Sequence, residues 1–312
     1  MPRWLGDAVH ASPALAALRG AGGIEAVDLV APEAHGAYFK ALGWTNALLP
    51  REDKDLVSRI KRGSYAVGIL FPKSFRSAWT LWRSGIKVRI GVPAEGRSFF
   101  LTHKVRWPLD RSSPLRLEYL ELARTAGAAT PPSDPYALLK AHFPGRKSKG
   151  LRSVAIHPGA AYGRSKVWAL ENYAALARGL ASRGIRVLAL GGKSEAESCR
   201  RVAEAGRGEN AAGLTDLQGT MDLLSMADVV VGGDSGPLHL ASALGRPVVG
   251  LYGSTSPAWT PPTGNKSLVL WGKTACGPCF RRDCAVGFRC LNLITVDAVL
   301  SAVLRQLPSG KV

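Results

Sequence analysis

The 312-residue sequence contains no apolar run of about 18 residues, the length that a helix needs to cross a bilayer. It also opens without the charged, apolar and small-residue segments of a secretory signal. These two absences argue against a membrane-spanning or secreted protein, and we expect a cytoplasmic one. Cysteine is scarce, at five residues, and a reducing cytoplasm disfavours a disulfide framework.

Acidic residues are also few. The chain has 23 Asp and Glu against 41 Lys and Arg, which gives a formal net charge of +18. Such an imbalance favours an anionic partner, which can be a nucleic acid, a membrane surface or a phosphorylated ligand. No nucleic-acid recognition module of the usual kinds is apparent. Without a spanning helix, peripheral attachment to anionic lipid remains open.

Small-residue turns alternate with β-branched runs and with stretches rich in Ala and Leu, a pattern typical of α/β proteins. Strands are predicted at residues 26–30, 66–71, 87–91, 153–157, 186–190 and 228–231. Helices are predicted at residues 75–83, 115–126, 171–183, 193–204, 216–226 and 295–307.

The length of the chain favours two domains. Pro, Gly and charged residues gather in the segment 127–150, which predicts a linker. We therefore expect domains at residues 1–140 and 151–312. A doubly wound domain usually begins with a buried strand, but this chain opens on MPRWLGD, a pattern typical of a strand-to-helix loop. The first strand is expected to be missing from this sequence, unless the domain tolerates its absence.

The segment 229–253 reads as a strand, a loop of small residues, a short helix and a second strand. The loop places Asp234, Ser235, Gly236 and His239 at the start of the helix, where partial positive charge and unpaired N–H groups suit a phosphate. Asp234 or Ser235 is expected to cap the helix. The alternative is a cap and a tight turn without a ligand. The string GDSGP also resembles the nucleophile motif of trypsin-like proteases, but those enzymes are β-barrels.

Two further segments carry candidate chemistry. The loop after the strand at 153–157 contains Gly159, Ser165 and Lys166. Backbone N–H groups with a mobile ammonium are what a diphosphate needs, although a solvated basic loop has the same composition. Asp7 stands at the start of a predicted helix, either as a capping residue or as a general base.

Four of the five cysteines lie within fifteen residues, at Cys276, Cys279, Cys284 and Cys290. Four thiols can hold tetrahedral zinc or an iron–sulfur centre. The first pair has the two-residue spacing of a ligand pair, but the later spacings match no known zinc ribbon. Disulfides and free thiols are the alternatives, and a metal bound here would be structural.

The WLGDAV start, the HPGA…K-W loop and the DSGP-x-HLA-x-ALG segment occur in this order along nearly the whole chain. Together they resemble glycosyltransferase family 9, the bacterial ADP-heptose:lipopolysaccharide heptosyltransferases. The cysteine-containing tail is similar to that of the heptosyltransferase II branch. The resemblance implies a GT-B fold, in which two Rossmann-like doubly wound domains face a cleft. The N-terminal domain would take the acceptor and the C-terminal domain the nucleotide sugar, and the last helix often crosses back to the first domain.

The same resemblance implies roles for individual residues. Asp7 would deprotonate the acceptor hydroxyl, and Lys166 would lie near the donor phosphates. Asp234 would contact the donor sugar, and Glu195 the ribose of the nucleoside. The diphosphate-binding loop would include Ser235, Gly236 and His239, with Gly159 and Ser165 in the second donor loop.

The implied reaction is an inverting, metal-independent transfer of heptose from ADP-L-glycero-D-manno-heptose to the inner core of lipopolysaccharide. No cofactor is required. The expected partners are ADP-heptose, the core acceptor and an anionic membrane surface, at the cytoplasmic face of the bacterial inner membrane, without nucleic acid. The alternatives are a transferase for another nucleotide sugar, a nucleotide-sugar-binding protein without catalysis, and a basic nucleic-acid-binding protein with a metal at its cysteines.

Overall fold

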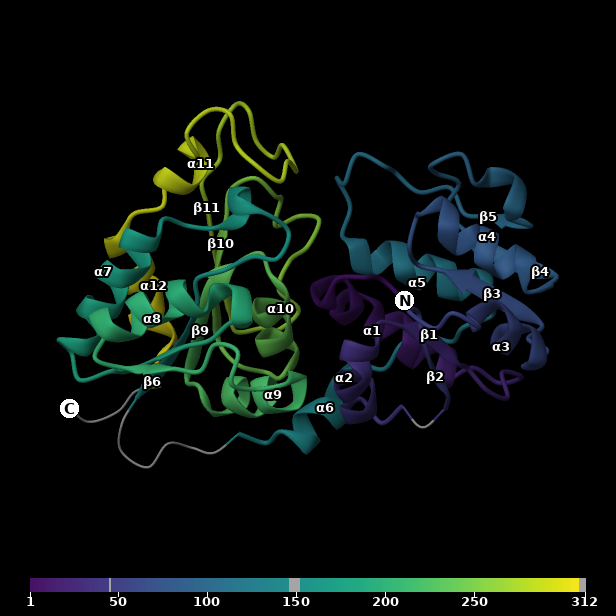
Figure 1. The fold of residues 1–312 in the computed structure, drawn as a ribbon, viewed down its shortest axis with the longest axis horizontal. Coiled ribbons are helices and arrows are strands. Elements are labelled where there is room, and N and C mark those ends of the chain that lie inside the picture. Colours follow the sequence, from purple (N-terminus) through teal and green to yellow (C-terminus); the bar gives the residue numbers. More distant parts are fainter. Residues whose placement is uncertain (45, 146–151, 309–312) are drawn as a thin grey trace. The chain divides into compact units, whose positions relative to one another are not determined.

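The computed structural model describes residues 1–44, 46–145 and 152–308, and the chain divides into two compact units, Met1–Leu138 and Leu139–Val312. Both units combine parallel strands with helices (Figure 1). The division falls inside the segment expected to be a linker. Part of that segment is nevertheless helical, since α6 spans Ala137–His142. Burial of apolar side chains explains this helix, since Leu139 and Phe143 are both buried. Residues 146–151 of the expected linker lie outside the described residues.

The first unit has short strands connected by helices. The helical elements are α1 (Leu5–Arg19), η1 (Glu33–His35), α2 (Gly36–Ala41), α3 (Leu56–Arg62), α4 (Phe75–Arg83), η2 (Ser98–Phe100) and α5 (Leu115–Thr125). The strands are β1 (Leu29–Ala31), β2 (Leu48–Pro50), β3 (Val67–Leu70), β4 (Val88–Gly91) and β5 (His103–Lys104). Helix α4 matches its predicted range because Ser74 caps it, accepting a hydrogen bond from the N–H of Ser77.

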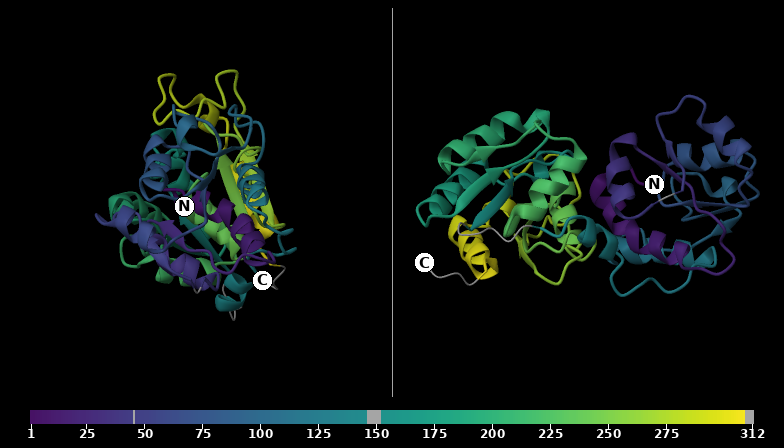
Figure 2. Two further views of the ribbon diagram at one scale, coloured as in Figure 1. Left: turned by 90° about the vertical axis from the view of Figure 1, so that its right-hand side faces the viewer. Right: turned by 90° about the horizontal axis from the view of Figure 1, so that it is seen from below.

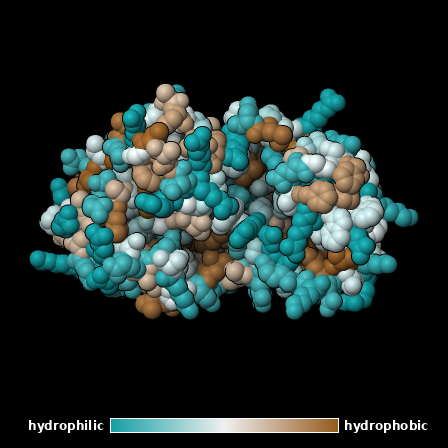
Figure 3. All heavy atoms as spheres, turned by 45° about the horizontal axis from the view of Figure 1, so that its top comes forward, coloured by the Kyte–Doolittle hydropathy of each residue, from teal (hydrophilic) through white to brown (hydrophobic). Residues whose placement is uncertain are grey.

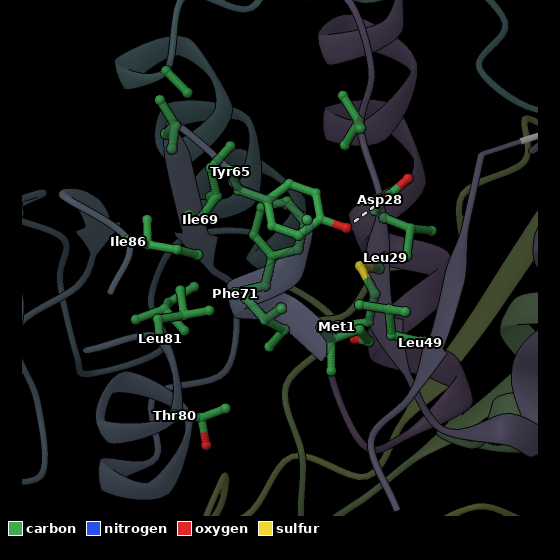
Figure 4. Close-up of a pocket in the computed structure, with 18 of the residues that line it drawn as sticks. Met1, Asp28, Leu29, Leu49, Tyr65, Ile69, Phe71, Thr80, Leu81 and Ile86 are labelled. Carbon is green, nitrogen blue, oxygen red and sulfur yellow. Dashed lines mark hydrogen bonds between the residues drawn. The ribbon is translucent and has the colours of Figure 1, made fainter. Parts of the chain in front are cut away.

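The strands of the first unit form two separate parallel sheets, β1-β2 and β3-β4-β5. Among the described residues, β1 pairs only with β2, and β3 pairs with β4 but with no strand on its other side. A cavity of about 760 Å³ separates the free edges of β1 and β3 (Figure 4). Apolar side chains line it from both sheets and their helices, among them Leu29, Leu49, Ile69, Phe71, Leu81 and Ile86.

Two polar contacts lie in this cavity. The hydroxyl of Tyr65 donates a hydrogen bond to the carboxylate of Asp28, which connects the segments leading into β3 and β1 (Figure 4). The amino group of Met1 donates to the carbonyl oxygen of Val30 at 2.5 Å, so the chain enters the cavity beside β1. The cavity thus occupies the position between two parallel strands where a doubly wound sheet has a central strand.

The second unit contains one six-stranded parallel sheet. Its strands are β6 (Ser153–His157), β7 (Arg186–Ala189), β8 (Glu209–Asn210), β9 (Val229–Gly233), β10 (Val248–Tyr252) and β11 (Ser267–Trp271), in the order β11-β10-β9-β6-β7-β8. The helical elements are η3 (Arg164–Lys166), α7 (Leu170–Ala181), η4 (Lys193–Glu195), α8 (Ala196–Ala205), α9 (Leu217–Met226), α10 (Gly236–Ala243), α11 (Arg289–Asn292) and α12 (Val296–Gln306). The order reverses between β6 and β9, which defines the switch point of a doubly wound sheet.

The last helix stays with the second unit. Helix α12 packs against α7, β9 and β10 (Figures 1 and 2). Its residues Val299, Ala302 and Val303 are buried in the same apolar core as the strands. The expectation that this helix crosses back to the first domain is therefore corrected, because its apolar face is already covered by its own sheet.

Among the described residues, no helix combines the length and the apolar character that crossing a membrane requires. On the face shown in Figure 3, hydrophilic side chains predominate and apolar ones form small groups. One set of large exposed apolar side chains belongs to α4 and η2 of the first unit.

Candidate functional site

The residues predicted to bind a diphosphate meet at the switch point of the second sheet. Strand β6 ends at His157 and β9 at Gly233, and the two strands are paired, with His157 opposite Gly232. The loop after β6 leads to Lys166, and the loop after β9 leads to Asp234 and α10. Because ligands of open α/β sheets bind at the carboxyl ends of the strands beside the switch point, this edge is the candidate donor site.

Asp234 is the centre of the cluster and is 4% exposed. Its Oδ2 lies 2.7 Å from Lys166 Nζ, which also donates to the carbonyl oxygen of Asp234 at 3.2 Å. Its Oδ1 lies 2.8 Å from His239 Nε2 and accepts from Thr260 Oγ1 at 3.2 Å. The carboxylate therefore holds Lys166 and His239 in fixed positions.

Burial opposes the ionisation of Asp234, but the ammonium of Lys166 and the hydrogen bond from His239 outweigh it. The pKa of Asp234 is accordingly held well below its ordinary range. Asp234 is thus a permanent anion that orients its partners, and it is unsuited to act as a base near neutral pH.

Helix α10 begins at Gly236, with Ser235 in the N-cap position but without a hydrogen bond from any capping side chain. The prediction that Asp234 or Ser235 caps this helix is wrong, because both side chains have other partners. The carboxylate of Asp234 binds Lys166 and His239, and Ser235 Oγ lies 3.2 Å from His157 Nδ1. The first N–H groups of the helix are therefore not engaged by a cap, which suits an anion.

His157 lies between Ser235 of the candidate diphosphate loop and Glu195, the residue predicted to bind the ribose. Its Nε2 lies 3.4 Å from Glu195 Oε2, which also accepts from the N–H of Gly192 at 2.7 Å. Burial tends to raise the pKa of Glu195, but the hydrogen bond and charge of His157 lower it below its ordinary value. A Cβ at Gly159 would lie 1.7 Å from Glu195 Oε1, so a larger residue there would displace the Glu195 carboxylate from this position. The sequence assigned His157 no role, although its place at the end of a strand was a signal.

Ser165 is fastened to the cysteine-containing loop. It is 2% exposed, its N–H donates to the carbonyl oxygen of Arg282 at 3.1 Å, and its hydroxyl donates to that of Arg281. The hydroxyl of Tyr162 donates to the carbonyl oxygen of Phe280 at 2.5 Å. These contacts brace the loop that carries Lys166. They give the side chain of Ser165 a structural contact, and its predicted donor contact stays a prediction.

Cys276, Cys279, Cys284 and Cys290 are free thiols that line one cavity of about 310 Å³, together with Ser165. Burial raises the pKa of Cys290, and the neighbouring Cys284 and Cys279 add to the effect. Within the described residues, no three Cys, His, Asp or Glu side chains are grouped closely enough to hold a metal ion. The thiols as placed do not form a ligand set, and a structural metal here stays a prediction.

Asp7 lies in the first unit, in the first turn of α1, and is partly buried. The positive end of a helix favours a carboxylate at this position. The charge of Asp7 is felt on α5. The pKa of Tyr119 on that helix is raised, first by burial of the hydroxyl and second by the nearby carboxylate of Asp7. The predicted residues are thus divided, with Asp7 in the first unit and the donor residues in the second.

A charged group at the carboxyl ends of β3 and β4 was missed by the sequence analysis. Lys73 Nζ lies 2.7 Å from Glu118 Oε2, and Glu118 is 1% exposed. Burial raises the pKa of Glu118 although Lys73 and Arg97 oppose it. Arg97, also buried, donates to the carbonyl oxygens of Val92 and Pro72. The only signal in the sequence was the Pro72-Lys73-Ser74 turn after a strand.

Comparison with known proteins defines the class. The model of glycosyltransferase family 9 (heptosyltransferase) matches residues 54–288, about three quarters of the chain. The chain belongs to this family and is a glycosyltransferase. The predicted GT-B fold class, with parallel sheets, is confirmed by solved structures of the family.

Heptosyltransferases of known sequence or structure are similar to this chain over nearly its whole length. Lipopolysaccharide heptosyltransferase 2 of Escherichia coli (strain K12) is 29% identical over 339 residues, covering 98% of this chain and 95% of the relative. The structure of E. coli ADP-heptose lps heptosyltransferase II is similar with a TM-score of 0.77 and 25% identity, covering 98% and 96% of the two chains. E. coli heptosyltransferase WaaC with ADP has the same fold, with a TM-score of 0.73, 22% identity and coverage of 97% of each chain.

Proposed function

We propose that the protein transfers heptose from ADP-heptose to the inner core of lipopolysaccharide. Relatives that align with nearly the whole chain are heptosyltransferases of lipopolysaccharide, and the name of one of them includes ADP-heptose. The observation that carries the proposal is the cluster of Lys166, Asp234 and His239 at the start of α10. It supplies positive charge and helix N–H groups where a nucleoside diphosphate leaves.

In this proposal the diphosphate gains negative charge as its bond to the sugar breaks. Lys166, His239 and the first N–H groups of α10 stabilise that charge where it develops. Asp234 keeps Lys166 in place, so little reorganisation is needed during the reaction. These groups provide the charge compensation of a metal-independent transfer.

At the other end of the donor, Glu195 is placed to accept hydrogen bonds from the ribose hydroxyls. Its pKa is lowered, so it is ionised near neutral pH and acts as an acceptor only. His157 and Gly192 orient the carboxylate. The nucleoside and the diphosphate are thus bound by connected residues.

The proposed base is Asp7, which takes the proton of the acceptor hydroxyl as that oxygen attacks the anomeric carbon. Attack from the face opposite ADP inverts the configuration of the sugar. The proposed place of the reaction is the cytoplasmic face of the inner membrane, where the net charge of +18 favours contact with anionic lipid and with phosphorylated acceptors.

The test is release of ADP from ADP-heptose, measured with and without a heptose-deficient lipopolysaccharide core acceptor. Wild-type protein is expected to release ADP only with the acceptor. Asp7→Asn is expected to abolish turnover while ADP still binds, and Lys166→Met to weaken both. Asp297→Asn and Lys266→Met change exposed residues of the second unit and serve as matched controls.

Four results would contradict the proposal. Release that does not depend on the acceptor indicates hydrolysis of the donor, and faster release from another nucleotide sugar indicates a different donor. Full turnover in Asp7→Asn would remove Asp7 from the proposed role of base. ADP binding without any turnover would favour a binding protein.

A further inference from the structure

Helix α4 has a wide apolar face, only part of which is buried in the core. Ala78 and Leu81 are buried in the core of the first unit. Beside this buried face, Phe75, Trp79 and Trp82 are 46%, 39% and 49% exposed. Their spacing of four and three residues places the three rings in one stripe along the helix. Because this stripe lies outside the core, core packing does not account for it.

Helix η2 extends the stripe. Phe99 is 70% exposed, and its ring centroid lies 6.3 Å from that of Phe75 and 4.0 Å from that of the buried Phe100. Trp82 also contacts Phe100, at 5.5 Å. Arg89 fixes this segment, since its Nε donates to the carbonyl oxygen of Phe100 at 2.5 Å. We call the exposed rings of Phe75, Trp79, Trp82 and Phe99 the aromatic patch.

The segment that carries α4 is strongly basic. Residues 56–94 contain eight Lys and Arg but no Asp or Glu. Arg76, Arg83 and Lys87 are exposed, and none of them forms an ion pair within the described residues. The guanidinium of Arg83 lies over the ring of Trp79, 5.5 Å from its centroid. We call Arg76, Arg83 and Lys87 the basic collar.

We propose that the aromatic patch and the basic collar dock the first unit on an anionic lipid membrane. Tryptophan and phenylalanine rings bury their apolar surface at the boundary between headgroups and acyl chains, while arginine and lysine bind the anionic headgroups. The patch provides both kinds of side chain on one short helix and the adjoining turn. Its rings are held in place before binding, so little side-chain freedom is lost on contact.

Single-stranded nucleic acid also binds surfaces with aromatic and basic residues, by stacking successive bases on the rings. The geometry favours lipid. The planes of Phe75 and Phe99 differ by 63°, and those of Phe99 and Phe100 by 43°. Such rings offer no common platform for stacked bases, whereas insertion among headgroups requires no shared ring plane.

The experiment is flotation with vesicles of phosphatidylcholine alone and of phosphatidylcholine mixed with phosphatidylglycerol. Wild-type protein is expected to bind the mixed vesicles and to dissociate as salt rises. The affinity of the double variant Trp79→Ser/Phe99→Ser for the mixed vesicles is expected to be lower by about tenfold or more. Arg76→Gln/Arg83→Gln is expected to weaken binding by about tenfold and to reduce its salt dependence.

The controls are matched in chemistry and lie in the second unit. Leu214→Ser/Leu293→Ser removes two exposed apolar side chains, and Arg178→Gln/Arg305→Gln removes two exposed charges. Both are expected to bind vesicles as wild type does. Circular dichroism and thermal unfolding of each variant establish that the fold is retained.

Failure of wild type to bind the mixed vesicles would overturn the proposal. So would unchanged binding by Trp79→Ser/Phe99→Ser, or a loss shared equally by the controls. Oligonucleotide binding that is lost in the patch variants, with vesicle binding intact, would assign the surface to nucleic acid. Transfer to a detergent-dispersed acceptor is expected to be unaffected by the patch variants, which separates this proposal from that of the sugar transfer.

Discussion

Lys166 and Asp234 form an ion pair that is almost withdrawn from water, with side chains 14% and 3% exposed. Such a pair is of little net benefit compared with apolar packing, but breaking it is costly, because the remaining charge stays buried. The same contact that would position Lys166 for the proposed diphosphate therefore also makes the fold depend on Lys166. At the residue scale, function and stability are coupled here.

Lys166→Met is expected to destabilise the protein by about 3 kcal/mol, because Asp234 is left as a buried anion with only His239 and Thr260 beside it. Urea denaturation measures the change. The added substitution Asp234→Asn is expected to restore much of the stability without restoring turnover. Lys266→Met, on the surface, is expected to stay within about 0.5 kcal/mol of wild type. A loss below about 1 kcal/mol in Lys166→Met would show an effectively solvated pair.

The depressed pKa of Asp234 predicts a dependence of stability on pH. The unfolded chain takes up a proton near the ordinary pKa of Asp, about 3.9, while the native carboxylate remains ionised. The contribution of Asp234 is therefore complete above that value and is lost as the pH falls below it. Urea denaturation from about pH 6 to pH 3 is expected to show a steeper loss for wild type than for Asp234→Asn. Equal slopes would contradict the buried pair, and Asp297→Asn is the control.

At the scale of elements, the two units differ in how their strands are arranged. The second sheet has six strands in one doubly wound order, whereas the first unit has strands of two to four residues in two sheets. The strand edges of β1 and β3 and the apolar side chains around them line the cavity between the two sheets of the first unit. One residue of a buried strand occupies about 160 Å³, so the gap has room for roughly five residues.

A segment of about five β-branched residues fused ahead of Met1 is expected to raise the unfolding temperature. The added segment would pair with both strand edges. It would also remove the buried amino group of Met1, whose pKa is lowered to about 5 by burial and by the charge of Arg51. Thermal unfolding of the fusion is compared with that of an extension of equal length made of Gly, Ser and Asp. The same rise in both would show that the cavity takes up no strand.

The elements that sequence predicted best are those with local signals. Residues 75–83 and 153–157 match their predicted ranges, the first through the cap at Ser74 and the second through a continuous buried run. The loops with Lys166 and Asp234 were found from motifs, but their pairing joins residues 68 positions apart and leaves no local pattern. For the same reason, the Lys73–Glu118 pair and the binding of Ser165 to the cysteine loop were not predictable.

At the scale of the whole molecule, the two units have separate cores. One core of the first unit gathers Leu49, Ile60 and Phe100, and that of the second gathers strands β6, β7, β9 and β10 with α7, α8 and α12. The proposed donor residues Lys166, Asp234 and Glu195 all belong to the second unit. Binding of the donor nucleotide is therefore expected to raise the stability of the second unit.

Calorimetry is expected to resolve two unfolding transitions, of which ADP raises only one. At about a hundred times its Kd, a ligand stabilises the unit that binds it by about 2.7 kcal/mol. Lys166→Met is expected to reduce the shift, because it weakens ADP binding, and Lys266→Met is expected to retain it. A single transition that moves as a whole with ADP would show that the two units unfold together.

The division at Leu138 and Leu139 has one more consequence, because the chain passes from one unit to the other only once. Within the described residues, α12, the last helix, packs in the core of the second unit. A single genetic crossover near this point is therefore enough to join the first unit of one relative to the second unit of another. Under the proposed function, acceptor choice and donor choice can then be inherited separately, and new pairings of the two can arise by recombination without rebuilding either core.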